Sequence, residues 1–242
     1  MRAADTAGTA RTARTAGKAG KAHTAALARN APDTDEMVLV HSLFRREYTA
    51  AISLVRGVGA GDTRRSETVA GHLAALGGML EEHHLAEDEL VWPRLADDSA
   101  VDARVLRRME EQHERIAEAL GRLQEALPRW RERAEPARRD AVADACADLV
   151  PVLAEHLADE EAHILPLVPG RFTAEQWARL SERGRAAVPK AHRLYMLGAM
   201  SAAAGADGQE QFLGRLPSPV RLLWRVAGRR LHRRATARLH GT

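Results

Sequence analysis

Residues 81–93 read EEHHLAEDELVWP, and residues 155–166 read EHLADEEAHILP. Aligned on their final prolines, the two strings share the pattern H-x-x-x-E-[DE]-x4-P. Residues i and i+4 of an α-helix lie on the same face, one turn apart, so each copy presents an imidazole and a carboxylate together. The residues in these positions are His83 with Glu87 and His156 with Glu160.

The repeat extends upstream of both strings. His41 precedes the first string and His113 the second, 72 residues apart, and a methionine stands four residues before each (Met37 and Met109). The histidines of the two strings themselves are 73 residues apart. We therefore interpret this part of the chain as a duplicated helical hairpin in which each half contributes H…HxxxE.

Four long helical segments are expected between residues 33 and 166. Aromatic residues make up only 4% of the chain, and Ala, Leu, Arg and Glu are abundant, which favours helices over strands. Gly-rich and Pro-containing positions mark the helix ends. The expected segments are 37–56, after a capping-box spacing of Asp33 and Glu36 and before GVGAGD at 57–62; about 66–92, ending at Pro93; about 101–127, ending before Pro128; and about 136–166, with a kink or break at Pro151. Short connections between them predict an all-α, up-down-up-down four-helix bundle.

Charge divides the chain into three parts, whose net charges are +4 for residues 1–34, −11 for residues 35–170 and +10 for residues 171–242. We expect a disordered basic tail, an acidic helical domain and a basic helical C-terminal extension, in that order. A single cysteine, no apolar run near the roughly 20 residues of a membrane span, and no secretion signal together favour a cytoplasmic protein without a transmembrane segment.

Helix lengths place the four repeat histidines at one height in the bundle, beside the two glutamates of the strings. Buried carboxylates are costly without compensation, and two divalent or trivalent metals would provide it. Imidazole and carboxylate together suit iron, manganese or zinc. A single HxxxE could lie on a solvated helix face, but two copies at the same distance from a proline favour a two-metal site.

These motifs resemble the hemerythrin-like, or HHE cation-binding, family. The strings that carry the resemblance are HHxxEDxxxWP around His83, QHERI around His113 and HLADEEAHILP around His156, together with His41. The resemblance covers about residues 35–170 and implies a non-haem di-iron centre in a four-helix bundle. It implies terminal ligands His41, His83, His113 and His156 and bridging ligands Glu87 and Glu160.

One position departs from the oxygen-carrying hemerythrins, in which the third helix offers HxxxH. The residue four beyond His113 is Ala117, which has no ligand atom. The set of four histidines and two glutamates is similar to that of the repair-of-iron-centres proteins and iron-sensing members. Fewer protein ligands leave more open metal positions, which favours reaction with dioxygen, nitric oxide or peroxide over reversible oxygen carriage.

Other functions stay open at this point. Iron handling, by ferrous oxidation or iron donation, is one, and a metal-stabilised binding module is another. A ferritin-like metal site is an alternative to the repeat, since Glu110 with His113 and Glu160 with His163 have E-x-x-H spacing. It would also require Glu47 and Glu87. The sequence assigns no catalytic residue and no oligomeric state.

Residues one position off the repeat register are His84, Asp88 and Glu161. We expect them to orient ligands or to lie at the surface, and we expect replacement of His84 to change little. His72, His163 and Tyr48 return to the ligand stripe. For the two histidines a place in the core or at the end of the bundle, and for Tyr48 core packing, is favoured over a role at the metal. Cys146 is expected to be a small buried residue.

Beyond residue 170, TAEQ at 173–176 predicts a helix to about residue 188, and a second helix is expected after Pro189. After a GADGQ break, residues 215–240 contain eight arginines, seven of them from residue 216 onward, and no acidic residue. Apolar residues at helical spacing, Val220, Leu223, Trp224, Ala227 and Leu231, predict a basic amphipathic helix. Such a helix could contact an anionic membrane, nucleic acid or an acidic bundle, or dock on its own bundle with a solvated Arg face.

Overall fold

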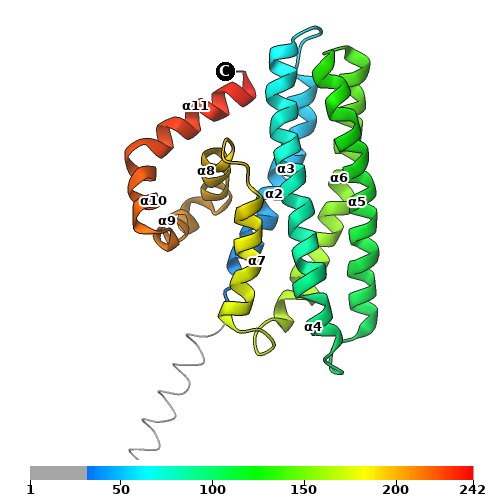
Figure 1. Ribbon diagram of the computed structural model, residues 1–242, viewed down its shortest axis with the longest axis vertical. Coiled ribbons are helices and arrows are strands. Elements are labelled where there is room, and N and C mark those ends of the chain that lie inside the picture. Colours follow the sequence, from blue (N-terminus) through cyan, green and yellow to red (C-terminus); the bar gives the residue numbers. More distant parts are fainter. Residues whose placement is uncertain (1–31, 242) are drawn as a thin grey trace, which may run out of the picture.

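The computed structural model describes residues 32–241, so the predicted N-terminal tail lies outside the described residues up to Ala31. Four long helices, α2 (Asp35–Arg56), α3 (Thr63–Leu90), α5 (Ala103–Glu132) and α6 (Pro136–His163), run antiparallel to their neighbours in sequence (Figure 1). Within the described residues no strand forms beyond an isolated bridge between Pro169 and Phe172. The predicted all-α, up-down-up-down bundle is confirmed.

The four helices form a square in which α2 contacts α3 and α6, while α5 contacts the same two helices from the other side. Helix α5 shows why they associate. Buried residues recur along it every three or four positions, the spacing of a single helix face. They are Leu106, Met109, His113, Ile116, Leu120, Leu123, Leu127 and Trp130. This stripe and its counterparts on the other three helices make the core and place His113 at its inner surface.

Two of the prolines do not end helices as predicted. Pro128 lies inside α5 and Pro151 inside α6, and α6 continues through Pro151 without a break. Both prolines are exposed, and so are Gln124 and Ala147, the residues four positions earlier. Each carbonyl that loses its N–H partner can therefore be solvated, which lowers the cost of the proline. Trp130, fully buried beyond Pro128, also fixes the last turn of α5 in the core.

The other helix ends differ by a few residues from the prediction. Helix α2 begins after Thr34, which makes no side-chain capping bond, so the expected capping box of Asp33 and Glu36 does not form. Helix α3 ends at Leu90, and Pro93 lies in the first turn of a short helix, α4 (Trp92–Ala96). Proline is well tolerated in a first turn because the N–H there has no partner within the helix. A short 3₁₀ turn, η1 (Leu165–Leu167), follows α6.

The C-terminal part is helical, as expected. Helix α7 (Ala174–Ala187) starts with the predicted capping box of Thr173 and Gln176 and packs against α3. Helices α8 (Arg193–Ala203) and α9 (Gly205–Arg215) follow, so the expected break falls at the first residue of GADGQ, where Gly205 has a positive φ, and the rest of the segment is helical. The basic segment is one helical stretch made of α10 (Ser218–Leu223), the π-helical η2 (Trp224–Gly228) and α11 (Arg229–His240).

Helices α8 to α11 lie beside the bundle, where α8 contacts α2 and α11 contacts α8 and α3 (Figure 1). Trp224 and Leu239 of the basic segment are buried there. The other apolar residues expected on one face differ in exposure: Val220, Leu223 and Leu231 are exposed and Ala227 is partly buried. None of the helices in residues 32–241 combines the length and the apolar character needed to cross a lipid bilayer.

Candidate metal centre

The six predicted ligands converge in the interior of the bundle and form two adjacent groups. In each group the nitrogen and oxygen atoms that could bind a metal lie within 4.8 Å of one another. The first group contains His41, His83, Glu87 and Glu160, and the second contains His84, Glu87, His113 and His156. All of these residues are buried. Glu87 belongs to both groups, the position expected of a bridging carboxylate, whereas Glu160 belongs only to the first.

The facing atoms are close but mostly unpaired. Nε2 of His41 lies 3.1 Å from Oε2 of Glu160, and Nε2 of His83 lies 3.1 Å from Oε1 of Glu87. Yet none of these four atoms, nor Oε2 of Glu87 or Nε2 of His84, has a partner with hydrogen-bonding geometry. Buried unpaired carboxylates are strongly destabilising. A cation that accepts lone pairs from both residue types removes this cost, so the residues fit a metal.

Two residues next to the strings' glutamates orient histidines across the bundle. Oε1 of Glu161 lies 2.9 Å from Nδ1 of His41, and Oδ1 of Asp88 lies 2.8 Å from Nδ1 of His113. A carboxylate only accepts, so Nδ1 of each histidine carries the proton and Nε2 remains free for a metal. Each half of the repeat thus supports a histidine of the other half, as expected for ligand-orienting groups.

Gln112 contacts a predicted ligand, although the sequence repeat does not indicate it. Its Oε1 lies 3.3 Å from Nδ1 of His156, and its Nε2 donates to Asp159 at 2.6 Å. It therefore orients a third histidine in the same way. The repeat offered no signal for it, because the equivalent residue of the first half, 72 positions earlier, is Val40.

In the protein without a metal, the negative charges of the Glu87 and Glu160 carboxylates would repel each other. Burial raises the pKa of Glu87, and repulsion from Glu160 raises it further, to about 7. Burial would also raise the pKa of Glu160, but the nearby charge of His41 lowers it to about 2. Glu160 is thus ionised, and its charge disfavours ionisation of Glu87. A cation between them would relieve this repulsion.

Three histidines are neutral at physiological pH. Burial lowers the pKa of His83 and of His156 to about 3, and lowers that of His84 well below its ordinary value. Neutral imidazole is the form that binds metals. Burial would also lower the pKa of His41 and His113, but the carboxylates around each of them raise it to about 9. Metal binding would displace those protons.

His84 lies inside the bundle and not at its surface. It is 7% exposed, and its ring centroid lies 4.2 Å from that of His113 and 5.0 Å from that of His156. Helix α3 lies between α2 and α5, so two consecutive residues on it can both face the interior. His83 faces the first group and His84 the second. The alignment that selects His83 for the repeat is compatible with a site that includes both.

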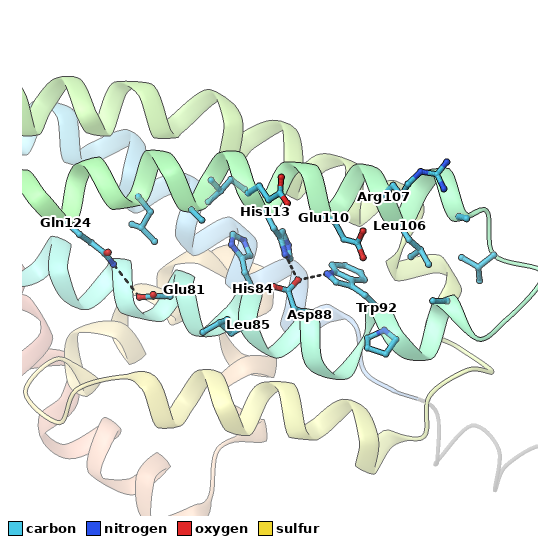
Figure 2. Close-up of a pocket in the computed structure, with 18 residues that line it drawn as sticks. Glu81, His84, Leu85, Asp88, Trp92, Leu106, Arg107, Glu110, His113 and Gln124 are labelled. Carbon is cyan, nitrogen blue, oxygen red and sulfur yellow. Dashed lines mark hydrogen bonds and ion pairs between the residues drawn. The ribbon is translucent and has the colours of Figure 1, made fainter.

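A groove of about 750 Å³ leads from the surface to the second group, between α3 and α5. Figure 2 shows His84 and His113 beside one another in this groove, with Asp88 linked to both His113 and Trp92. Residues that line it include Glu81, His84, Asp88, Trp92, Glu110, His113, Glu114 and Ala117. No side chain unique to the first group lines it, so the two metal positions differ in access.

The ferritin-like alternative does not fit this arrangement. Glu110 and His163 are exposed, and His163 binds the backbone oxygen of Asp159 at the end of α6. Glu47 lies elsewhere, where its carboxylate accepts from Tyr195 at 2.9 Å and lies 3.3 Å from Nε2 of His72. These residues belong to no common metal group.

Tyr48 and Cys146 are buried in the main hydrophobic core, as expected for packing residues. Burial raises the pKa of the Cys146 thiol to about 12, which disfavours the reactive thiolate.

Comparison with protein families finds one match, which covers more than half of the chain. The sequence model of the hemerythrin HHE cation binding domain matches residues 33–168. Comparisons with curated proteins and with solved structures find no match. The matched region contains both histidine and glutamate groups and the residues that orient them. The chain belongs to the hemerythrin HHE cation-binding domain family.

Proposed function

We propose that this protein binds two irons and uses them to bind, sense or transform dioxygen, nitric oxide or peroxide. The observation that supports the proposal is the pair of buried groups that share Glu87 and meet a groove at one end. Iron is favoured over manganese or zinc by the family, since the donor set suits all three. A cytoplasmic location is part of the same proposal.

Each residue of the centre would have a distinct role. His41 and His83 would hold the first iron and His113 and His156 the second, with Glu87 as the carboxylate bridge and Glu160 on the first iron. Asp88, Glu161 and Gln112 keep Nε2 of their histidines directed to the centre. Bound iron supplies electrons and open coordination positions for a small molecule. The protein excludes water around the first group and admits a small molecule from the groove to the second.

Metal analysis and rapid mixing test this proposal. Protein made with sufficient iron should contain about two irons per chain. The reduced protein is then mixed separately with dioxygen, nitric oxide and peroxide, and its absorption is followed in time. Rapid turnover would identify an enzyme, and a stable adduct would identify a sensor or carrier. Fewer than two bound metals, or no reaction with any of the three, contradicts the proposal.

Iron handling is a second candidate, favoured by the charge of the groove. Glu81, Asp88, Glu110 and Glu114 line it, whereas Arg107 is the only Lys or Arg among its lining residues. An acidic entrance attracts cations and would ease the entry or release of iron. Transfer of iron from the loaded protein to an external chelator, faster than its reaction with any of the three small molecules, would favour this function.

A further inference from the structure

The second metal group contains one imidazole more than the repeat provides. His84 comes from α3, and its possible ligand atoms lie within 4.8 Å of those of Glu87, His113 and His156. The side chain is 7% exposed, and its Nε2 has no hydrogen-bond partner. An imidazole nitrogen that is buried and unpaired beside two other imidazoles has no evident stabilising role without a cation.

On α5, one position close to the second group carries no metal-binding side chain. Ala117 lies four residues, or about one turn, beyond His113 and on the same helix face. It is exposed and lines the groove together with His84 and His113, and it contributes no ligand atom. Its small side chain leaves room on that wall, and His84 approaches from the opposite wall (Figure 2).

We propose that His84 is a ligand, the third imidazole of the second metal position, and that it supplies from α3 the donor that Ala117 cannot supply from α5. The centre is then asymmetric. The first metal is held by His41 and His83 with both glutamates, and the second by three histidines with Glu87. The inference rests on the proposed function, since it assigns a ligand to one of the two metals.

This ligand has a consequence for the chemistry. A fourth protein donor, beside Glu87, His113 and His156, leaves the second metal one open position fewer than those three residues alone would. The groove reaches this metal, so the imidazole of His84 also limits which small molecules can approach it. The number of imidazoles per metal, and not activity, is therefore the primary measurement.

X-ray absorption of the iron-loaded wild-type protein counts these ligands directly. Five histidines shared by two irons give about 2.5 imidazoles per iron, whereas the four repeat histidines alone give about 2. A value near 2 in a protein that holds two irons overturns the inference and leaves the proposed function standing. A protein that holds fewer than two irons overturns the proposed function and this inference with it.

His84→Phe provides a second test, because phenylalanine can stack on His113 but cannot bind a metal. Titration of the metal-free protein with Co²⁺, followed by visible absorption, should show one site retained and the other weakened by about 100-fold or more. Loss of an outer hydrogen-bond partner costs roughly 10- to 100-fold. Adding Ala117→His to His84→Phe should restore the second site from α5.

The matched control is His163→Phe, since His163 is exposed at the end of α6 and outside both groups. It should bind two Co²⁺ ions as the wild type does. Thermal melting of each metal-free variant separates loss of a ligand from loss of the fold. If folded His84→Phe binds two Co²⁺ ions with wild-type affinity and spectrum, His84 only packs in the site and the inference is wrong.

Discussion

At the scale of single residues, Glu87 is the most connected member of the centre. Its two carboxylate oxygens lie 3.1 Å from Nε2 of His83 and 3.5 Å from Nε2 of His113, which belong to different groups. A ligand shared by both metals lowers their mutual repulsion, whereas a terminal imidazole serves one metal and can be replaced by water. Loss of the two kinds of residue should therefore have unequal effects.

We predict that Glu87→Ala loses most of both irons and that His113→Ala retains about one, as measured by metal analysis after gel filtration. Glu160→Ala should also lose most iron, because its carboxylate is buried beside His41. Glu110→Ala is the control, since Glu110 is exposed and only a ferritin-like site would require it. Iron loss from Glu110→Ala with retention in Glu87→Ala would reverse the assignment.

Asp88 illustrates support by a residue that binds no metal itself. Its Oδ1 accepts from Nε1 of Trp92 and lies beside Nδ1 of His113, both at 2.8 Å. In Asp88→Asn the neutral amide holds the imidazole less firmly, so affinity for the second metal should fall by roughly 10- to 100-fold. Co²⁺ titration measures the change. Unaltered affinity would mean that packing alone orients His113.

At the scale of helices, a buried polar cluster attaches α8 to the bundle. The carboxylate of Glu47 on α2 accepts from Arg46 and from Tyr195 of α8, and it lies 3.3 Å from Nε2 of His72 on α3. Arg46 also donates to the backbone oxygen of Ala199. Burial would raise the pKa of Glu47, but these partners lower it to about 2. The ionised form is thus the one that holds the helices together.

We predict that Glu47→Gln lowers the free energy of unfolding by about 1.5–3 kcal/mol near neutral pH, the usual range for hydrogen bonds to a charged group. Because the pKa of Glu47 is lower in the folded state, its contribution is complete above its ordinary value of 4.5 and is lost as pH falls towards about 2. The charged and titratable groups around it are Arg46, His72, Tyr195 and His232.

Denaturant unfolding from pH 7 to pH 2.5 measures this effect, with hydrogen exchange of α8 as the local readout. The difference between wild type and Glu47→Gln should shrink on acidification. Glu182→Gln is the control, because Glu182 is exposed on α7. A difference that is constant over the whole range would exclude ionisation of Glu47 as its source.

At the scale of the whole molecule, the C-terminal helices form a basic surface with exposed apolar side chains. Leu222, Leu223 and Val226 are 63%, 61% and 77% exposed. They stand in residues 216–240, which carry seven arginines and no acidic residue. Arginine attracts anionic lipid by about 1 kcal/mol per residue near a membrane, and apolar side chains can enter the interface. We propose an anionic membrane surface as the partner.

The full-length protein should sediment with vesicles of phosphatidylcholine and phosphatidylglycerol, and less with phosphatidylcholine alone or in high salt. Replacing Leu222, Leu223 and Val226 by serine should weaken binding about tenfold or more. Val38→Ser is the control, because Val38 is 40% exposed on α2 and lies outside residues 216–240. Binding to DNA but not to anionic vesicles would assign the surface to nucleic acid instead.

The sequence by itself determined the class of fold and the convergence of six residues. Both follow from local periodicity: His83 with Glu87 and His156 with Glu160 are one turn apart in any helix, and their duplication fixes a common height in a bundle. The helix end predicted at Pro128 was wrong, and no break occurs at Pro151, because the cost of an interior proline depends on whether the carbonyl it leaves unpaired reaches water.

Only the tertiary structure decided which residues beyond the repeat join the site. His84 faces inward because α3 has neighbours on two sides, and no sequence period indicates how wide an arc of a helix is buried. Gln112 reaches His156 across the interface of α5 and α6, and the equivalent residue of the first half, Val40, has no polar side-chain atom for such a contact. The groove beside Ala117 likewise depends on how α3 and α5 pack. Local spacing specifies what each helix presents, whereas packing between helices selects which of those side chains meet.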